Sequence, residues 1–531
     1  MKHRARRVPP PDHGRLDEIR YYPVEQVRWD MGFNSRTVPF HAVRVEPSMS
    51  DDRRYGTLST ADSISDGDPM FVAAEASGTA AAGSKPAGRN LALNSFAMMF
   101  STIATGGLGL AFWAVAGRLF PVEEVGSASA VIASAVMIAT LSNLSLGSMY
   151  ERFLPAAGVQ AKSYVLRGYA AVLSLALGLG CAFLLVAPLD KLFTTTAEIV
   201  TFPLFVGVLA VFALQDQTSS GLGFARWAAA KNIFHAVVKL AILAVTYETG
   251  RSFTIIAAWA VPAAIAAIVL FRAFGKKLSS DPRYRLTPDL PPRKELWSYF
   301  GSAYGITALG TLAPLMIPII VVSTLGAEQN AYFSLTWSIV SAMYVLIGVL
   351  VGPFVAEAAA HPEHFSKLAK RFIGLLCVVA AGGSLFLAVI APFGLGLVGP
   401  DYRENGTIIV HLAAVTIPLA VVGAVYDGLA RVRRRMRLAV LVQIAATIII
   451  VTGSLTLSRE MGIAGIGWSY LAAEAFGALV LVVPLVRWIR DLSQGSGVEQ
   501  TPPSSSEARG EHSSRLRPVA GAATGSNGNH P

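Results

Sequence analysis

Residues 94–148 read NSFAMMFSTIATGGLGLAFWAVAGRLFPVEEVGSASAVIASAVMIATLSNLSLGS, two apolar stretches joined by a short charged connection. A helix that rises about 1.5 Å per residue needs roughly 20 apolar residues to cross a hydrocarbon layer of about 30 Å. The two stretches, 95–117 and 126–149, are both long enough. This part of the sequence therefore predicts a pair of membrane-spanning helices.

The same pattern continues along the chain to residue 488. We expect ten further spans, of which the fourth is short and has the least defined ends: 168–188, 200–214, 232–249, 253–274, 298–323, 331–356, 372–393, 406–427, 438–456 and 463–486. Hydrophobic residues make up 53% of the chain and charged residues 15%, which is too apolar for a soluble protein of this size. We predict an all-α polytopic membrane protein with about twelve transmembrane helices.

Basic residues are distributed unevenly between the connections. With a cytoplasmic N-terminus, the inner connections carry twenty Lys and Arg residues, Lys231 among them, and the outer connections carry five. Positively charged connections favour the cytoplasmic side, so we expect a plasma-membrane protein with both termini in the cytoplasm. Basic loops that face an anionic inner leaflet account for the formal charge of +10 without a nucleic acid partner.

The apolar region divides into two halves with the same plan. Residues 91–275 and 298–490 each supply six spans, and a basic, proline-containing linker at 276–297 joins these two lobes. The polar flanks, 1–90 and 491–531, are predicted to be a disordered cytoplasmic N-terminal extension and a disordered cytoplasmic tail.

The two halves also resemble each other weakly in sequence. AGRLFPVEEVGSASAVIA joins the first two spans and VVSTLGAEQNAYFSLTWSI joins the seventh and eighth, which places Glu123 and Glu328 at matching positions. Two six-helix lobes with the same orientation form a parallel repeat, an arrangement that suits alternating access.

A resemblance to a known family is carried by residues 94–148. They resemble the first two helices of polysaccharide and O-antigen flippases of the multidrug/oligosaccharidyl-lipid/polysaccharide exporter superfamily. The matching positions are an Asn before a Gly-rich helix, an Arg-Leu step and a Pro followed by Gly, the last one residue later than the family spacing: Asn94, Gly106, Gly107, Gly109, Arg118, Leu119, Pro121 and Gly126. The segment GLGFARWAAAKN, 221–232, is similar to the family's connection into its fifth helix.

This resemblance implies a MATE-like fold of two six-helix lobes and a transport function. The implied cargo is a lipid-linked oligosaccharide on a carrier of the polyprenyl pyrophosphate type, with membrane lipids and enzymes of polysaccharide assembly as candidate partners and no cofactor. Many flippases of this kind carry fourteen helices. Twelve is the number in the drug-exporting branch, so the class of substrate stays open.

Polar residues inside the fifth span are the main candidates for a substrate site. Asn232, His235 and Lys239 follow one another at three- and four-residue steps, which places them on one helical face. Ionisable groups at membrane depth normally face the bundle interior or a wet cavity. We interpret this stripe as a cationic wall for an anionic head group such as a lipid pyrophosphate, with Asn143 and Tyr304 as further cavity-lining candidates. The alternative is that Asn232 and His235 lie near the cytoplasmic surface and that Lys239 pairs with a carboxylate.

Three carboxylates are candidates for coupling transport to an ion gradient: Glu474, Asp216 and Asp427. Glu474 lies about half-way along the twelfth span, where a buried carboxyl can take up and release a proton as a cavity opens and closes. A static ion pair or hydrogen bond between helices is the competing interpretation. In the seventh span, Pro314 and Pro318 each remove a backbone hydrogen bond, so this span is the expected bent gate.

The sequence therefore favours a transporter that moves a lipid-linked oligosaccharide from the inner to the outer leaflet for cell-surface polysaccharide biosynthesis. An ion-coupled exporter of drugs or other small molecules with the same fold is the alternative, and it would need an acidic cavity. A membrane-bound polysaccharide polymerase or glycosyltransferase is disfavoured because the outer connections are short and HEXXH, GXSXG and nucleotide-binding motifs are absent from the sequence. We expect no enzyme activity, no catalytic residues and no metal.

Overall fold

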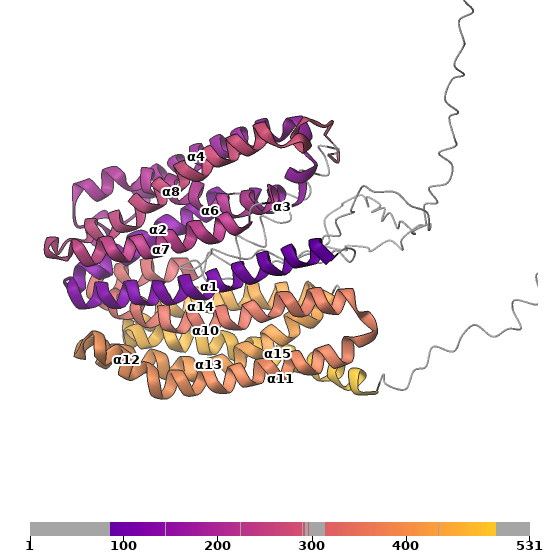
Figure 1. Cartoon of the computed structure of the whole chain (residues 1–531). Helices are drawn as coiled ribbons and strands as arrows, with labels where there is room; N and C mark the ends of the chain where they lie inside the picture. Colours follow the sequence, from indigo (N-terminus) through magenta and orange to yellow (C-terminus); the bar gives the residue numbers. More distant parts are fainter. Residues whose placement is uncertain are drawn as a thin grey trace, which may run out of the picture. The chain divides into compact units, whose positions relative to one another are not determined.

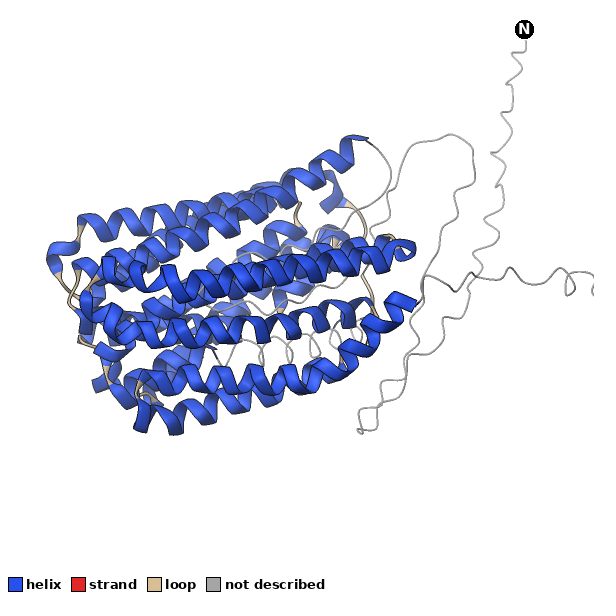
Figure 2. Cartoon of the chain, turned by 90° about the horizontal axis from the view of Figure 1, so that it is seen from below, coloured by secondary structure: helices blue, strands red, loops and turns tan. Residues whose placement is uncertain are grey.

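The computed structural model describes residues 85–494, apart from 144, 224, 289, 293–295, 297–313 and 434. These residues belong to one compact unit, Leu58–Pro531. All regular secondary structure in these residues is helical (Figure 2). Within them, ten helices are long and apolar enough to cross a membrane. An all-α polytopic membrane fold, as predicted, is therefore confirmed.

The first group of helices is drawn in indigo to magenta in Figure 1. It comprises α1 (Lys85–Leu119), α2 (Val122–Ser142), α3 (Leu146–Phe153), α4 (Ala161–Val186), α5 (Leu189–Leu192), α6 (Thr196–Gly221), α7 (Ala225–Val245) and α8 (Ser252–Ser280), with short 3₁₀ turns at Leu154–Ala156, Gly158–Gln160 and Tyr247–Thr249. Helix α6 is central, because it packs against α2, α4, α7 and α8. Helix α1 runs beside α7 and also contacts α10 of the second group.

The second group occupies the lower part of Figure 1. It comprises Pro314–Leu325, α10 (Ala327–Ala360), α11 (Phe365–Leu385), a π-helical turn at Phe386–Ile390, α12 (Ala391–Val398), α13 (Pro400–Val432), α14 (Arg437–Met461) and α15 (Ile463–Gln494), with a 3₁₀ turn at Pro362–His364. Helix α13 is its centre and packs against α10, α11, α12 and α15. The seventh predicted span is described only from Pro314 onward.

The fourth span is longer than the sequence predicts. We expected it to end at Leu214, because the polar residues QDQTSSG follow, but α6 continues to Gly221. The polar side chains Gln215, Asp216, Thr218 and Ser219 are buried inside the lobe. The helix begins with a capping box in which Thr195 and Glu198 satisfy each other's backbone N–H groups. The prediction of a short helix was wrong because polarity was taken as a sign of a loop.

The fifth span begins earlier than predicted. Helix α7 starts at Ala225 and not at residue 232, so Lys231 belongs to the helix. Lys231 was counted among the basic residues of an inner loop, but its side chain is buried, with 6% of the residue exposed. It is therefore part of the lobe interior.

The second span ends earlier than predicted. Helix α2 stops at Ser142, seven residues before the expected end, and Ser145 adopts a left-handed conformation with φ of 55°. Left-handed backbone interrupts a right-handed helix, so the chain changes direction here and continues as α3.

The two groups of helices are in direct contact at the end that holds the α1–α2 connection, here called the α1–α2 end. Asn330 Nδ2 donates hydrogen bonds to the Gly126 carbonyl at 2.8 Å and to Ser129 Oγ at 2.7 Å. A side chain at Gly126 would collide with the carbonyl group of Ala327. The start of α2 therefore lies against the start of α10 with no room for a larger residue.

Two basic side chains tie the groups together at the same end. Arg118 donates to the Leu397 carbonyl at 2.6 Å, and Lys191 donates to the Ser323 carbonyl at 2.9 Å. Each bond joins a residue of the first group to a residue of the second.

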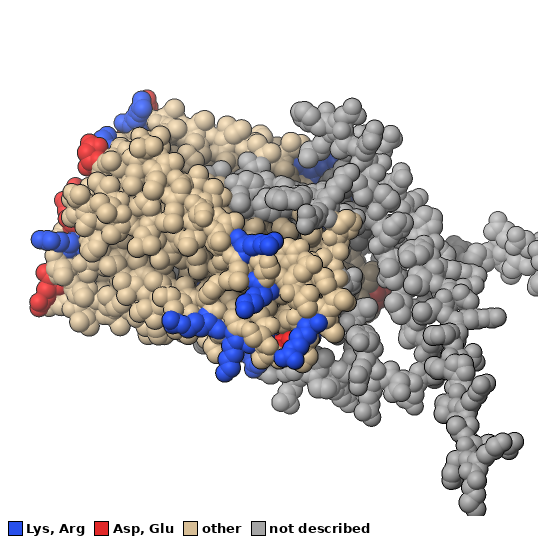
Figure 3. Space-filling model, turned by 90° about the horizontal axis from the view of Figure 1, so that it is seen from above, with Lys and Arg blue, Asp and Glu red and all other residues tan. Residues whose placement is uncertain are grey.

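On the face drawn in Figure 3, charged side chains lie mainly toward the two ends of the bundle. The face in Figure 3 shows basic residues gathered toward one end, acidic and basic residues at the other, and a broad uncharged region between them. This uncharged region is the pattern expected for a lipid-facing surface.

The described start of the predicted linker lies against the first group of helices. A 3₁₀ turn, η4 (Pro282–Arg285), follows α8 directly. Beyond it, the Leu286 carbonyl accepts a hydrogen bond from the Val159 N–H at 3.0 Å. Gly158 has a φ of +47°, and a side chain there would collide with Leu286. The linker is therefore anchored at this point.

Candidate functional site

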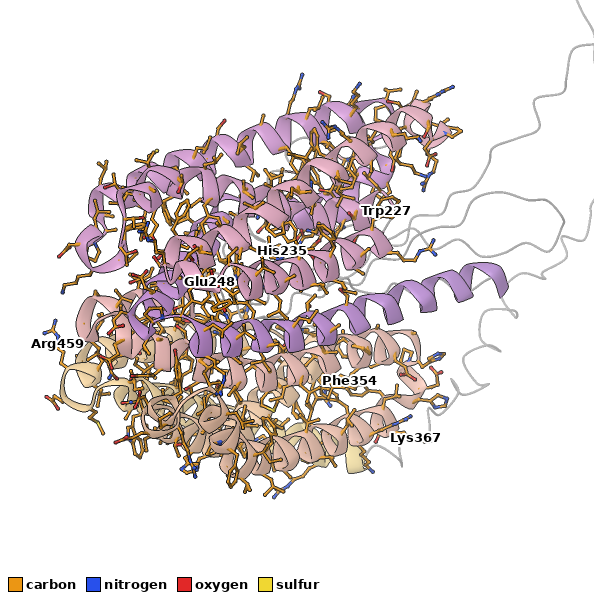
Figure 4. All side chains as sticks on the ribbon, turned by 60° about the vertical axis from the view of Figure 1, so that its left-hand side comes forward. Trp227, His235, Glu248, Phe354, Lys367 and Arg459 are labelled. Carbon is orange, nitrogen blue, oxygen red and sulfur yellow. The ribbon has the colours of Figure 1, made fainter. Side chains whose placement is uncertain are left out.

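The stripe predicted on the fifth span lies on the buried face of α7. Lys231, Asn232, His235 and Lys239 are all buried, at three- and four-residue spacing. Figure 4 shows His235 about midway between Trp227 and Glu248, which mark the two ends of this segment. His235 is therefore buried inside the first group of helices, about midway along this segment.

Among the described residues, Lys231 and not Lys239 has a carboxylate partner. Lys231 Nζ lies 2.7 Å from Asp216 Oδ1, and the side chains are 3% and 8% exposed. Asn232 donates from Nδ2 to Asp216 Oδ2 at 3.1 Å, so both oxygens of this carboxylate have a partner on α7. The pair joins α6 to α7, and Lys231 Nζ also donates to the Phe212 carbonyl at 2.5 Å. Asp216 is thus a member of a buried ion pair.

His235 is bonded to the backbone of α8. Its Nε2 lies 3.0 Å from the Trp259 carbonyl oxygen. Since a carbonyl oxygen only accepts, Nε2 carries the proton and donates it. The imidazole ring also packs against Phe212, with ring centroids 4.9 Å apart. These contacts fix the orientation of the ring.

Lys239 is surrounded by aromatic rings. Its Nζ lies 3.6 Å from the ring centroid of Trp259 and 5.1 Å from that of Phe112. Only 6% of the residue is exposed. Within the described residues, no carboxylate pairs with it and no carbonyl accepts a hydrogen bond from it. Cation–π attraction replaces an ion pair at this position.

The remaining cavity candidates are placed separately. Asn143 forms the C-cap of α2, and its buried Oδ1 has no hydrogen-bond partner in the described structure. Tyr304 lies outside the described residues. Pro314 and Pro318 fall within the helix Pro314–Leu325, and Pro318 is buried. The bend predicted for this span stays a prediction, because the preceding residues are not described.

The other two coupling candidates differ in their partners. Asp427 forms an ion pair with Arg431 at 2.8 Å, one turn further along α13. Glu474 is half-buried on α15, and its Oε1 lies 3.4 Å from the Tyr344 hydroxyl of α10.

A small cavity of about 10 Å³ lies beside Tyr344 and is also lined by Trp337, Thr416 and Tyr470. This volume holds roughly one water molecule.

A larger hollow lies elsewhere on the second group. It measures about 470 Å³ and is lined by Gly396, Pro400, Arg403, Glu404 and Thr407, where α12 meets α13. None of the predicted site residues lines it. The cationic stripe of α7 is therefore the better candidate for a functional site.

Sequence reasoning missed two parts of this site. Lys231 was read as a loop residue, although its position four residues before His235 and eight before Lys239 places it on the same helical face. Trp259 and Phe112 come from distant helices, and an aromatic residue in an apolar span carries no signal of its own. Only the packing of α1 and α8 against α7 brings these rings to Lys239.

The architecture is that of a polytopic helical membrane protein. No family model matches this sequence, and no curated protein matches it. Solved structures match in fold. An inward-facing multidrug resistance MATE family transporter of the MOP superfamily superposes with a TM-score of 0.58 at 14% identity, over 76% of this chain and 99% of its own.

A second neighbour is the lipid II flippase MurJ in an inward closed conformation. It gives a TM-score of 0.57 at 10% identity, over 76% of this chain and 90% of its own. At these identities the likeness establishes the fold and not the substrate. The predicted MATE-like fold is confirmed.

Proposed function

We propose that this protein is a membrane transporter that moves a lipid-linked oligosaccharide from the inner to the outer leaflet by alternating access, for cell-surface polysaccharide biosynthesis. The carrier is of the polyprenyl pyrophosphate type. The proposal places the protein in the plasma membrane, with both termini in the cytoplasm and enzymes of polysaccharide assembly as partners. Support for the fold comes from neighbours that are transporters and a lipid II flippase.

One observation carries the choice of an anionic cargo. Lys239 is a buried cation that no carboxylate neutralises among the described residues, whereas nearby Lys231 is neutralised by Asp216. A charge inside a membrane protein is costly because it is removed from water. Such charges are therefore rare, and they usually mark a functional site. A pyrophosphate group entering the lobe would neutralise Lys239 and leave again when the cavity opens on the other side.

A flipping assay tests this proposal directly. The full chain is reconstituted in liposomes with a fluorescent polyprenyl diphosphate oligosaccharide, and movement between leaflets is followed by quenching. We expect Lys239→Ala to slow flipping about tenfold or more, since it removes a charge-assisted contact, and Lys239→Arg to retain most activity. The control is Lys367→Ala, which removes an exposed lysine of α11. Flipping by Lys239→Ala at the wild-type rate would refute the role of this cation.

A second function is favoured by a different residue. Glu474 contacts Tyr344, and its contacts in the described part include no cation, so it could serve an ion-coupled exporter of cationic small molecules. Uptake of a cationic dye into inverted vesicles distinguishes the two functions. Dye transport that is lost in Glu474→Gln, together with no flipping of the lipid-linked sugar, would favour the exporter.

A further inference from the structure

The aromatic cover of Lys239 contains a second unsatisfied donor. The indole Nε1 of Trp259 is buried and has no hydrogen-bond partner in the described structure. Buried N–H groups are almost always bonded, so an orphan donor in a well-packed lobe calls for an explanation. Its ring is the one that lies over the Lys239 ammonium.

Two donors therefore meet at one place without an acceptor. The ammonium lies 3.6 Å from a ring centroid of the Trp259 indole, the same side chain that carries Nε1, so both donors are within a few ångströms of each other. Asp216, the nearby carboxylate, already forms an ion pair with Lys231 and accepts a hydrogen bond from Asn232. Among the described residues, no side chain supplies an acceptor for these two donors.

The surrounding contacts hold the indole in position. Phe112 packs edge-to-face on Trp259, with centroids 5.9 Å apart, and His235 does the same at 5.8 Å. The His235 bond to the Trp259 carbonyl fixes the backbone at this residue. These contacts hold the indole plane in one orientation, so the N–H group of Trp259 points in a fixed direction, as a hydrogen-bond donor in a binding site requires.

We propose that Lys239 and the indole N–H of Trp259 together bind one phosphoryl group, and that Trp259 is the specificity-determining residue of the site. A phosphoryl group carries several oxygens, so it accepts from the ammonium and the indole at the same time. This inference rests on the proposed function, because the phosphoryl group is that of the lipid diphosphate carrier. The sugar needs no contact with this pair.

Binding of inorganic pyrophosphate to the purified full chain in nanodiscs tests the site by calorimetry. Trp259→Phe keeps a ring over Lys239 but removes the donor, and we expect it to weaken binding about fivefold, as for one lost hydrogen bond. Lys239→Gln should weaken binding about tenfold or more. The matched control, Trp113→Phe, changes another buried tryptophan that contacts Phe112, and it should bind as the wild type.

Four outcomes separate the possibilities. Equal affinity of Trp259→Phe and wild type, with unchanged melting temperature, overturns the inference. A short-chain polyprenyl diphosphate that binds far more tightly than free pyrophosphate assigns the site to the lipid carrier, while equal binding assigns it to the phosphoryl group alone. If neither pyrophosphate nor the polyprenyl diphosphate binds to the wild type, the inference is also overturned.

The flipping assay keeps this inference distinct from the proposed function. If the wild type flips the lipid-linked sugar and Trp259→Phe does so equally well, the site is refuted but the function stands. If the wild type binds pyrophosphate in a Trp259-dependent manner but flips nothing, the site stands and the proposed function fails.

Discussion

Ser129 of α2 and Ser334 of α10 share a hydrogen bond of 2.9 Å across a separation of 205 residues. The same offset separates Val122 from Ala327, where these two helices begin, and Glu123 from Glu328. When two equivalent bodies are related by a twofold axis, equivalent residues meet on that axis. The serine contact therefore joins equivalent positions of α2 and α10.

A disulfide between positions 129 and 334 should arrest transport. In a background with Cys181→Ser and Cys377→Ser, the pair Ser129→Cys and Ser334→Cys is expected to oxidise readily, because their Oγ atoms are already in contact. Alternating access requires this end to open, so the oxidised protein should lose flipping and regain it on reduction. The liposome assay with and without dithiothreitol measures the effect. Either single cysteine is the control, and full flipping by the oxidised pair would contradict the prediction.

Gly126 sets how closely the halves approach at the same place. A methyl group there would collide with the Ala327 carbonyl, so Gly126→Ala should push the α1–α2 end apart. We expect the cysteine pair at 129 and 334 to cross-link several times more slowly in this variant, as followed by mass spectrometry. The control is Gly348→Ala in α10, where an added methyl group meets nothing within 4 Å. Unchanged cross-linking in Gly126→Ala would show that the contact tolerates a side chain.

Much of the fold could be predicted from the sequence because a bilayer imposes a length and a polarity on each helix. Errors arose where polar residues lie at membrane depth. Gln215 and Asp216 were read as the end of a helix, and Lys231 as a loop residue, yet all three are buried in the first lobe. Hydropathy reports average polarity, and it does not register that a polar residue has found a partner inside the protein.

The candidate site could be predicted only in part for a related reason. The helical spacing placed Asn232, His235 and Lys239 on one face, because that depends on local geometry alone. The choice of Lys231 as the partner of Asp216, and of Trp259 as the cover of Lys239, depends on how α6 and α8 pack against α7. Such contacts between distant helices have no signature in a single sequence.

The Asp216–Lys231 pair should behave as a unit. Removing one partner leaves an uncompensated buried charge, which costs about 3 to 5 kcal/mol of stability, whereas replacing both by neutral groups is often tolerated. We therefore expect Asp216→Asn and Lys231→Met each to lower the melting temperature of the purified protein strongly. The double variant should recover most of the loss. The control, Lys162→Met, removes an exposed lysine and should have little effect.

A double-variant cycle decides this point. Additive losses in the double variant would indicate that the two residues act independently and that the 2.7 Å contact does not contribute to stability.

The anchor of the linker should weaken in acid. Arg283 donates hydrogen bonds to Asp281, and Lys277 adds an ion pair at 2.9 Å; these contacts hold the pKa of the Asp281 carboxyl below its usual value. A carboxylate whose pKa is lower in the folded protein than in the unfolded chain stabilises the folded arrangement in which it is paired. That contribution is complete above the ordinary aspartate pKa of about 4 and is lost as the pH falls through the lowered value.

Hydrogen exchange at residues 281–288 measures the anchor in the full chain. Protection should be constant between about pH 7 and pH 5 and should decline only below about pH 4, within the range that the protein tolerates. Asp281→Asn should reduce protection at every pH, because it removes the charge that Arg283 and Lys277 bind. Gly158→Ala should also reduce it, by displacing Leu286, but without changing its pH dependence. Equal protection of Asp281→Asn and wild type at neutral pH would mean that the hydrogen bond from Val159 to Leu286 suffices to hold the linker.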